Sequence, residues 1–444
     1  MKVLLIYFNL VFVSNSFFAQ QLPVYKVVKQ ETSSSDGYYF FVTNGNLIIM
    51  DKDAQIVYYK QGKFDFDFIM EPNGKMYFST FNAILAMDST FQIRDTIVSK
   101  NGMQLDPHDK LFMPNGHILL LGTENLNYDL KNYPELQQSW KKDSISVQYA
   151  VLQEQDAQRN VSFEWHAKDH FKLSDADTFY VNVDKIPAWT HCNSFALDTD
   201  GNILLSSRNL CEITKINRTT GAVMWRLGGK QNEFKFVNCP TPFYGQHDIK
   251  RIANGHITLL DNGDYKVPHG ARAMEFDLDE TNKTATLKWS YTYDSKMKSK
   301  ARGNVQRLTS GNTLVSFGVT KGDSICFVIV NSEGKKLFQV NGPSAYRLTN
   351  YPDLPFKLHR PTINCFDSAG VKYLDAGSGH LSYKWNSGET TRVITLTKAG
   401  NYLVYVPCGD GGFISSEKYV VTDLTKPCGL KSSSIRNKNK ELKK

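Results

Sequence analysis

A turn motif followed by an apolar run recurs along this chain and limits the possible folds more than any other feature. Each copy has a polar residue, a glycine and then residues of high strand propensity, as expected where a hairpin turn enters a strand. The copies are NGKMYFST at 73–80, NGHILLLG at 115–122, DGNILLSS at 200–207, NGHITLLD at 254–261 and SGNTLVSF at 310–317. Self-similarity of this kind predicts a repeat architecture.

Each copy of the motif belongs to a longer unit. A strand precedes each glycine, and two further strands separated by polar turns follow the motif. The segment from Tyr38 has the same pattern without the leading turn, which makes six units. Four-stranded units arranged around one axis form an all-β, six-bladed β-propeller, which we assign to residues 21–357. A long β-sandwich would show the alternation, but not strands and turns in this fixed order. For the polar insertion at 123–144 we expect a loop or a short helix.

The pattern changes near Leu358. Residues 358–425 contain short strands, with a tryptophan on one strand and Gly-Asn-Tyr at the start of a later one. These features predict a small Ig-like β-sandwich. Residues 426–444 are rich in Ser and Lys and have few core-forming side chains, so we expect a disordered tail.

The charge of the chain is concentrated in this tail. The whole chain has 52 Lys and Arg against 44 Asp and Glu, a formal net charge of +8. Residues 426–444 contribute seven basic residues and one acidic residue, so the body is close to neutral. Charge therefore gives no support for a nucleic-acid partner. With 41% hydrophobic and 22% charged residues, the composition also excludes a largely disordered chain and a coiled coil.

The first twenty residues have the pattern of a leader. Lys2 precedes a mostly apolar run at 3–13, and the segment SFFAQ follows. This predicts a secretory signal peptide at 1–20, cleaved near Ala19 or Gln20. An uncleaved anchor is disfavoured, because polar residues interrupt the run and it is shorter than the ~20 apolar residues of a membrane span. We expect an exported protein, periplasmic or extracellular, without a membrane span.

Seven cysteines occur in this chain, and the expected compartment is oxidising. Some of them should pair, and an odd number leaves at least one over. No two are spaced as CxxC, which excludes a zinc ribbon. Cys326 lies within the apolar run ICFVIV and is expected to be a buried thiol. The connectivity stays open.

Alignment of the units on their glycines gathers polar residues at one level. The innermost strand of a propeller blade lines the central channel. Eight residues before the glycines lie Phe66, His108, Asn193, His247 and Gly303, and one step on lie Asp67, Asp109, Ser194, Asp248 and Asn304. His191 is two residues before Asn193, and Arg208 ends the following strand. Three units thus place different polar residues toward one axis, which favours one asymmetric site over a repeated scaffold contact.

Other polar residues are expected to be structural. His117 and His256 follow the turn glycine on the strand itself, and for His166 and His170 a scaffold role is preferred. Asp261-Asn262-Gly263 ends a strand, and turn chemistry is its expected role. For any single histidine of the cluster taken alone, a scaffold role is preferred, since His and Asp at propeller turns often hold blades together; the case for one site rests on the three units taken together.

Two kinds of chemistry fit three histidines, an asparagine and an arginine. Three imidazoles are a familiar zinc set, but an adjacent Arg208 would repel a cation. The alternative is transfer of an anionic group, in which arginine and imidazoles hold its oxygens and one imidazole attacks. The chain has no Gly-rich phosphate loop, so a nucleotide donor is not expected.

Several motifs resemble the arylsulfate sulfotransferase family. These are PHD before NGHILLLG, HCNS at 191–194, SSR at 206–208 and GQHDIKRIANGHITLLDNG at 245–263, and the resemblance covers about residues 38–345. Family members are exported six-bladed propellers that move a sulfuryl group from a phenolic sulfate ester to another phenol. They use no 3′-phosphoadenosine 5′-phosphosulfate and pass through a sulfohistidine, with double-displacement kinetics.

The resemblance implies a role for each residue of the cluster. It makes His247 the nucleophile and His108 and His191 supporting imidazoles, while Asn193 and Arg208 bind sulfuryl oxygens. No cofactor and no metal is implied, and the partners are an aryl sulfate donor and a phenolic acceptor. The alternative is a non-catalytic exported propeller that binds a ligand or a partner at its channel mouth. A metal-dependent lactonase-type propeller is weaker, because it needs channel carboxylates. Oligomeric state stays open.

Overall fold

The computed structural model describes residues 22–31, 37–134, 137–138, 141–177, 179–180, 188–263, 267–320 and 325–428. The expected signal peptide at 1–20 lies outside this range, as does the expected tail from residue 429 onward. The described chain is all-β, and nearly all of its strand pairs are antiparallel; β17 and β21 form a parallel pair. None of its helices is long and apolar enough to cross a membrane.

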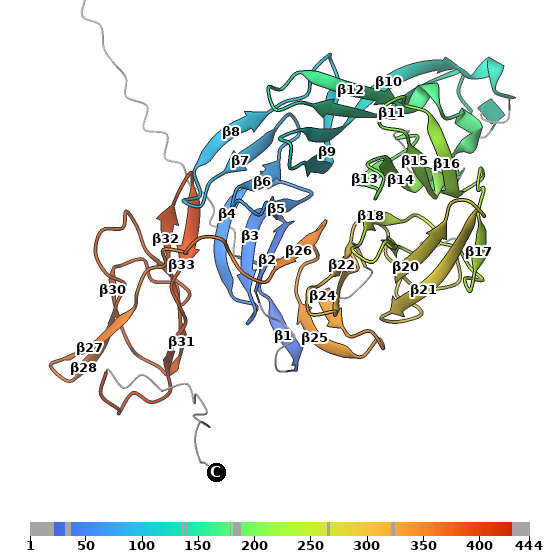
Figure 1. Cartoon of the computed structure of the whole chain (residues 1–444). Coiled ribbons are helices and arrows are strands. Elements are labelled where there is room, and N and C mark those ends of the chain that lie inside the picture. The colour runs from blue at the N-terminus through green and yellow to red at the C-terminus, as the bar shows by residue number, and fades with distance from the viewer. Residues whose placement is uncertain are drawn as a thin grey trace, which may run out of the picture.

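Six sheets follow one another along the chain and surround a common centre (Figure 1). Sheet 1 has β26 (Leu348–Tyr351), β2 (Tyr38–Thr43), β3 (Gly45–Asp51) and β4 (Ile56–Phe64); sheet 2 has β5 (Phe68–Met70), β6 (Met76–Ser79), β7 (Ile84–Met87) and β8 (Ile93–Ile97); sheet 3 has β9 (Gln104–Phe112), β10 (Ile118–Asp129), β11 (Ser144–Gln155) and β12 (Val161–His166). Sheet 4 has β13 (Cys192–Leu197), β14 (Ile203–Ser207), β15 (Glu212–Ile216) and β16 (Val223–Gly228); sheet 5 has β18 (His247–Arg251), β19 (Ile257–Asp261), β20 (Arg272–Asp279), β21 (Thr284–Thr292) and β17 (Lys235–Val237); sheet 6 has β22 (Asn304–Arg307), β23 (Thr313–Ser316), β24 (Ile325–Val330), β25 (Lys336–Asn341) and β1 (Lys26–Gln30). In each sheet the strand named first lies nearest the centre (Figure 1).

The repeated glycines lie where the sequence predicts turns. Each sits between the first and second strands of its sheet and has a φ of 81° to 85°. Residues with a Cβ rarely adopt this left-handed conformation, so glycine is the residue that a tight turn of this kind requires. The predicted hairpins at these five positions are confirmed.

Sheet 1 is completed from the far end of the chain. The segment from Tyr38 supplies β2, β3 and β4, and the innermost strand β26 pairs with β2 from residues 348–351. At the other seam β1 pairs with β25. This explains the missing leading turn of the first unit, since no strand precedes β2 in this sheet along the chain.

The expectation of a loop or short helix at 123–144 is confirmed for the described residues of 130–143 and wrong for 123–129, which continue a strand. Thr123 to Asp129 pair with Ser144 to Ala150, so β10 and β11 continue as one long hairpin. A short 3-10 helix, η1 (Leu130–Asn132), follows β10 and buries Leu130. Pairing satisfies the backbone polar groups that a loop would leave to water.

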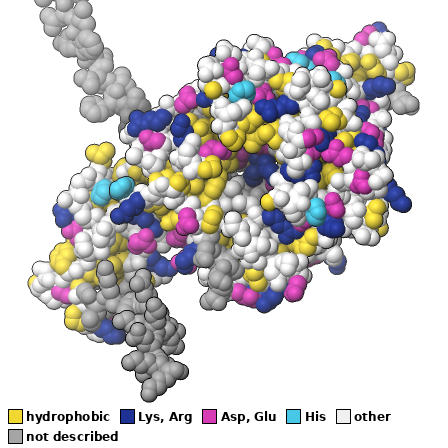
Figure 2. Space-filling model, viewed as in Figure 1, with side chains coloured by type: hydrophobic (Ala, Val, Ile, Leu, Met, Phe, Trp, Pro, Cys, Tyr) yellow, Lys and Arg dark blue, Asp and Glu magenta, His cyan; other side chains and the backbone are white. Residues whose placement is uncertain are grey.

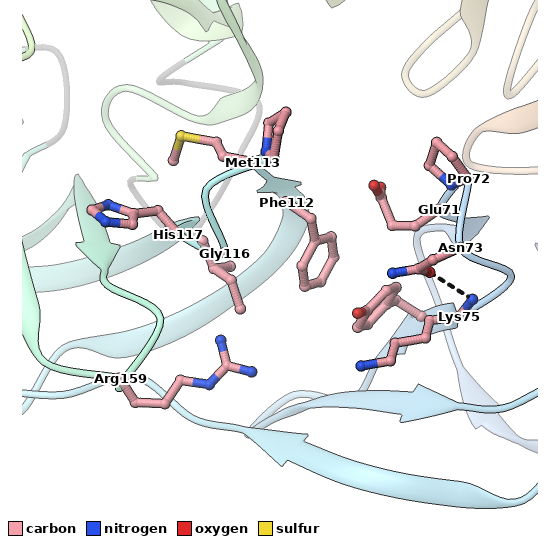
Figure 3. Close-up of a pocket in the computed structure, with 12 residues that line it drawn as sticks. Glu71, Pro72, Asn73, Lys75, Phe112, Met113, Gly116, His117 and Arg159 are labelled. Atoms are coloured by element: carbon pink, nitrogen blue, oxygen red, sulfur yellow. Dashed lines mark hydrogen bonds between the residues drawn. The ribbon is translucent and has the colours of Figure 1, made fainter.

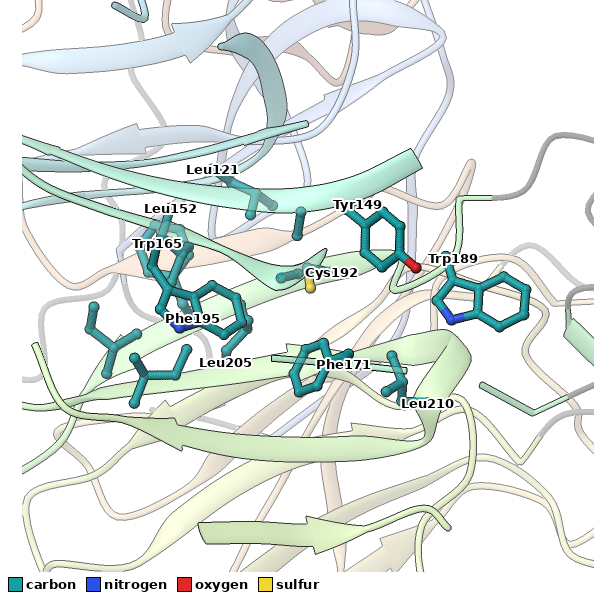
Figure 4. Close-up of a cluster of buried hydrophobic side chains, with 14 of the residues drawn as sticks. Leu121, Tyr149, Leu152, Trp165, Phe171, Trp189, Cys192, Phe195, Leu205 and Leu210 are labelled. Atoms are coloured by element: carbon teal, nitrogen blue, oxygen red, sulfur yellow. The ribbon is translucent and has the colours of Figure 1, made fainter. Parts of the chain in front are cut away.

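Apolar side chains fill the spaces between neighbouring sheets. Between sheets 3 and 4 the buried cluster includes Tyr149, Leu152, Trp165, Phe195 and Leu205 (Figure 4). Burial of large apolar and aromatic side chains is the main stabilising contribution in such an interior. It also fixes β13, which carries part of the site described below.

The C-terminal residues form smaller sheets around their own core. The strands are β27 (Asn364–Ser368), β28 (Val371–Asp375), β29 (Lys384–Trp385), β30 (Val393–Thr395), β31 (Gly400–Tyr402), β32 (Val404–Cys408), β33 (Gly412–Ser415) and β34 (Tyr419–Val421). Trp385 is buried with Leu374 and Ile394. The strand β33 pairs with β4, so sheet 1 continues into this part of the chain.

One disulfide establishes part of the connectivity of the seven cysteines. Cys365 is bonded to Cys428, which links the start of the C-terminal strands to the last described residue. Cys192, Cys211 and Cys239 are buried and are not part of a disulfide. Cys326 is also a buried thiol, as its apolar surroundings predict.

Candidate active site

The innermost strands of sheets 3, 4 and 5 lose their regular register where the predicted cluster lies. The pairing of β9 with β10 shifts between Lys110 and Leu105, that of β13 with β14 shifts at Asn193, and that of β18 with β19 shifts after His247. Irregularities of this kind re-aim side chains and are frequent beside active sites. In a space-filling view, the centre of the ring is hollowed and Lys and Arg side chains gather around it (Figure 2).

The polar residue one step after four of the five aligned positions connects neighbouring sheets. Its side-chain oxygen accepts a hydrogen bond from a backbone N–H of the next sheet. The pairs are Asp109 with Phe195 N at 3.0 Å, Ser194 with Ile249 N at 2.9 Å, Asp248 with Val305 N at 3.2 Å and Asn304 with Leu348 N at 2.9 Å. These residues are therefore structural, and their repetition around the ring explains their regular spacing in the sequence.

Arg347 holds three of the buried carboxylates, and sequence reasoning missed it. Its guanidinium is 2.9–3.1 Å from the carboxylates of Asp67, Asp109 and Asp248, which come from or adjoin three different sheets. Lys110 also binds Asp67. Arg347 lies beyond the last repeated unit, so the glycine alignment gave no signal for it.

The three predicted histidines and Arg208 share one electrostatic environment. The rings of His108 and His191 are 5.4 Å apart. Burial and then the charges of Arg208, His108 and His247 hold the pKa of His191 well below its usual range. The structure therefore brings these four residues together, although they come from three different sheets.

His247 is buried, and its protonation is fixed by its partners. Its Nδ1 is 2.8 Å from Asn262 Oδ1 and 3.2 Å from the carbonyl oxygen of Gly245. Burial, followed by the nearby charge of Arg208, lowers the pKa of His247 to about 3. The imidazole is neutral at physiological pH, and its Nδ1 donates to these acceptors.

Steric constraints explain why position 245 in the GQHD motif is a glycine. It has a φ of +66°, and a Cβ at this position would lie 2.1 Å from the hydroxyl of Tyr180. Glycine thus allows both the left-handed turn before His247 and the close approach of Tyr180. The same Tyr180 ring stacks on Arg208, whose guanidinium carbon is 4.3 Å from the ring centroid.

Arg208 is held in a fixed direction by other contacts as well. It lies in the short 3-10 helix η4 (Arg208–Leu210) directly after β14. Its Nη1 donates to Asn209 Oδ1 at 3.1 Å and its Nη2 donates to the carbonyl oxygen of Lys300 at 3.0 Å. Such a planar, preorganised cation suits an anion better than a flexible ammonium group does.

His108 differs from His247 in its partner and exposure. Its Nδ1 contacts the carboxylate of Asp106, and its side chain is 19% exposed. The rings of Phe66 and Tyr346 lie 4.5 Å and 5.5 Å from the imidazole. Asp106, Phe66 and Tyr346 thus complete the surroundings of His108. Of these, only Phe66 appeared in the glycine alignment.

Asn193 lies in the same region, but its amide joins strands. It is fully buried, its Nδ2 donates to the carbonyl oxygen of Gln246 at 2.7 Å, and its Oδ1 accepts from Ser194 Oγ at 3.0 Å. Contact with the residue before His247 gives Asn193 a direct route to position the nucleophile candidate. The predicted contact of Asn193 with a sulfuryl oxygen stays a prediction.

The four remaining histidines considered above have contacts outside the cluster. His117, His256 and His166 pair with Glu154, Glu275 and Glu124 at 2.6, 2.6 and 2.8 Å. His170 stacks on Trp165 with ring centroids 4.9 Å apart. Their structural interpretation agrees with these contacts.

The expectation for Asp261-Asn262-Gly263 is only half right. Asp261 serves the turn, since its Oδ1 accepts from Gly263 N at 3.0 Å. Asn262, however, contacts His247. The sequence Asp-Asn-Gly predicts a turn, and no local pattern indicates that a histidine of another strand contacts Asn262 at the end of β19.

The described residues contain no group of three or more His, Cys, Asp or Glu side chains arranged to hold a metal ion. A cavity of about 470 Å³ opens between the hairpin turns of sheets 2 and 3, with Glu71, Phe112, His117 and Arg159 in its lining (Figure 3). It lies at the opposite end of β5 and β9 from the cluster, and the two share no residue.

Comparison with solved structures gives weak resemblances. A protein of unknown function from Bacteroides caccae is 12% identical, with a TM-score of 0.46, and the match covers 71% of this chain and 98% of that one. Virginiamycin B lyase from Staphylococcus aureus is 10% identical, with a TM-score of 0.35 and coverage of 80% and 96%. No curated protein matches this chain.

Comparison with protein families is decisive. The family model described as Arylsulfotransferase (ASST) matches residues 24–351, a span that contains all six sheets and the whole histidine cluster. The match ends at the last residue of β26, which closes sheet 1. This chain therefore belongs to the arylsulfotransferase family.

Proposed function

We propose that this protein is an aryl-sulfate sulfotransferase that moves a sulfuryl group from a phenolic sulfate ester to a phenolic acceptor through a sulfohistidine on His247. The observation that carries the proposal is the protonation of His247. With Nδ1 occupied as a donor, the lone pair of the ring is on Nε2, and this uncharged nitrogen shares its surroundings with the cation of Arg208. A neutral nucleophile beside a fixed cation suits attack on an anionic ester.

In the first step His247 Nε2 attacks sulfur. An N–S bond forms, the bond between sulfur and the phenolic oxygen breaks, and its electron pair stays on that oxygen. Arg208 balances the negative charge of the sulfuryl oxygens, with Asn193 as the second predicted contact. His108 gives a proton to the leaving oxygen, and the free phenol departs.

The second step reverses these events with another phenol. His108 takes the proton of the acceptor hydroxyl, whose oxygen attacks sulfur. The N–S bond breaks, its electron pair returns to Nε2, and His247 is regenerated. His191, uncharged and packed against His108, contributes shape and hydrogen-bonding capacity without adding a second charge. No nucleotide, metal ion or other cofactor takes part in this scheme.

Finer aspects of architecture and location belong to the same proposal. We infer that the six sheets are blades of one six-bladed β-propeller, supported by their order around a common centre. The C-terminal strands around Trp385 are proposed to be an Ig-like module. Export after cleavage near Ala19 or Gln20 rests on the leader sequence.

A labelling experiment tests the proposed intermediate. Brief exposure to sulfur-labelled aryl sulfate should leave label on the protein that is labile in acid and stable in base, as expected of an N-sulfuryl imidazole. His247→Asn removes the attacking lone pair and should abolish both label and turnover. His117→Asn, at a histidine paired with Glu154 outside the cluster, is the matched control and should retain both. Label that persists in His247→Asn and disappears in His108→Asn would transfer the nucleophile's role to His108.

The cofactor expectation has its own test. Release of a coloured phenol from its aryl sulfate, with a second phenol as acceptor, should proceed without added nucleotide and in the presence of a chelator. The physical reason is that Arg208 and the imidazoles supply the positive charge and proton transfer that a metal would otherwise provide. Turnover that disappears on chelation and returns with zinc or calcium would contradict this expectation.

A further inference from the structure

We infer that Asn262 and Asp106 are positioning residues that give two similar histidines different tasks, His247 that of the nucleophile and His108 that of the proton donor and acceptor. The inference rests on the proposed function and deepens it. Each residue contacts Nδ1 of its histidine, but one presents a neutral amide oxygen and the other a carboxylate. The two histidines therefore have matching geometry and unlike charge partners.

The orientation of the Asn262 amide is fixed by its other contacts. Its Nδ2 donates to the carbonyl oxygen of Arg302 at 3.0 Å and to Ser299 Oγ at 2.8 Å. A carbonyl oxygen only accepts, so the NH₂ group must face Arg302 and the oxygen must face His247. Nδ1 of His247 must then be the protonated nitrogen, and Nε2 keeps the lone pair.

Asp106 holds His108 by two contacts. One carboxylate oxygen accepts from the backbone N–H of His108 at 3.0 Å and also contacts Nδ1. The first contact fixes the carboxylate on the irregular part of β9, and the second sets the direction of the ring. A carboxylate on Nδ1 stabilises the imidazolium that forms when Nε2 takes up a proton. His108 is thereby prepared to hold and release a proton at Nε2.

Arg208 is a further charge in this region. After burial, it lowers the pKa of both His191 and His247, so it helps to keep His247 uncharged. Tyr346 packs against His108 and His247, and burial keeps its pKa well above the usual value, so its hydroxyl is neutral. The charge of Arg347 is directed at its own three carboxylates. The Nδ1 contacts, with an amide oxygen in one case and a carboxylate in the other, are the geometric difference between His247 and His108.

This arrangement follows a general rule for acid–base pairs. When similar titratable groups have environments that favour opposite charge states, the difference assigns their chemical roles. A neutral partner leaves buried His247 uncharged and nucleophilic. The carboxylate on Nδ1 of His108 orients the ring and balances the positive charge that it carries while Nε2 holds the proton for the leaving phenolate. Replacing the Asn262 amide by a carboxylate should therefore impair the nucleophile His247, whereas replacing the Asp106 carboxylate by an amide should impair proton transfer by His108.

Two reciprocal substitutions test the inference. Asn262→Asp places a carboxylate on His247, and an adjacent opposite charge raises a pKa by about 1–3. Starting from about 3, the pKa of His247 should stay below 7, so the first burst of phenol should slow by up to ~10-fold at pH 5 and little at pH 7. The loss should be similar for all leaving groups and should recover as the pH rises. Asp106→Asn should leave the burst from aryl sulfates with acidic phenols nearly unchanged. With poorly leaving phenols it should slow the reaction by ~10²–10⁴-fold, the usual contribution of acid catalysis.

Ser299→Ala is the matched control, because it removes one donor contact of Asn262 without touching the amide oxygen that faces His247. It should keep the pH profile of the unaltered protein. If Asn262→Asp shows the unaltered pH profile, or if Asp106→Asn slows all leaving groups equally, the assignment of roles is wrong.

A spectroscopic measurement keeps the test independent of turnover and of variant folding. Nitrogen-15 NMR of the unaltered, full-length protein should show the proton of His247 on Nδ1 and none on Nε2 at pH 7, with assignment by comparison with His247→Asn. A proton on Nε2, or titration of His247 near neutral pH, would overturn the inference directly. Failure to form any labelled protein would instead overturn the proposed function, while this tautomer could still be observed.

Discussion

At the scale of single residues, the chemistry of the site depends on what each polar side chain donates to or accepts from. Arg208 illustrates this, since its two terminal nitrogens bind separate oxygens and its plane stacks on Tyr180. These contacts fix the direction of the charge before any substrate arrives. Preorganised charge of this kind is commonly the largest contribution to stabilising a transition state.

The first prediction concerns this preorganisation. Arg208→Lys keeps the positive charge but loses the planar fork, so one ammonium group must replace contacts to both Asn209 and Lys300. We expect kcat/KM for an aryl sulfate to fall about 10²-fold, in the range found when one transition-state donor is removed. Steady-state kinetics at pH 7 measure this effect. An unchanged kcat/KM would mean that charge alone is sufficient at this position.

At the scale of elements, residues at the ends of the innermost strands connect neighbouring sheets and so hold the ring together. Side chains from these strands accept backbone hydrogen bonds from the next sheet, and the segment before β26 adds Arg347 between the carboxylates of Asp67, Asp109 and Asp248. Closure of sheet 1 by β26 therefore coincides with neutralisation of the buried charges. The residues that hold the ring together lie directly beside those that form the site.

The second prediction tests this closure. Arg347→Met keeps the approximate length of the side chain but leaves buried carboxylates without their main cation. Breaking a buried ion pair in this way should reduce the free energy of unfolding by about 3–5 kcal/mol. Urea unfolding at pH 7 gives the value.

Lys250→Met is the comparison variant for Arg347→Met. Lys250 is more exposed and lies 3.7 Å from Asp109 and Asp248, so its loss should cost less than about 1 kcal/mol. Equal effects of the two substitutions would contradict the central role of Arg347.

At the scale of the whole molecule, burial of uncharged imidazoles links stability to pH. His191 and His247 have pKa values below the usual one of an unfolded chain because burial and then Arg208 disfavour their charged forms. Below about pH 6.5 the unfolded chain gains protons at these positions that the folded protein does not. The histidine contribution to stability is therefore complete above this pH and decreases as the pH falls toward 3, the pKa of folded His247.

The third prediction follows from this linkage. Between pH 6 and pH 5 the free energy of unfolding should decrease with falling pH, with a slope that approaches roughly 1.4 kcal/mol per pH unit for each such histidine. In His247→Asn this slope should be smaller by up to roughly 1.4 kcal/mol per pH unit, the contribution of one histidine. Urea unfolding at several pH values in this window measures it. The same slope in both proteins would show that His247 is protonated in the folded state.

Much of this architecture could be predicted because its signals are local. A glycine turn and the strand that follows are adjacent in sequence, so five hairpins could be located from residues alone. Because the residues that connect neighbouring sheets recur at one offset from the glycine, counting back from the glycine also located His108, Asn193 and His247. The disulfide between Cys365 and Cys428 and the pairing of β33 with β4 join distant segments, and no local pattern encodes such contacts.

The same distinction applies within the site. Residue identities and offsets determined which imidazoles face the centre, whereas tertiary structure decided what each imidazole contacts. Asn262 is fifteen residues from His247, and Arg347 lies beyond the repeats. Their roles depend on which side chains meet when the sheets close into a ring. The sequence by itself thus determined the repeated strands and the position of the cluster, and only the tertiary structure decided its protonation and charge balance, because both depend on partners brought together by closure of the ring.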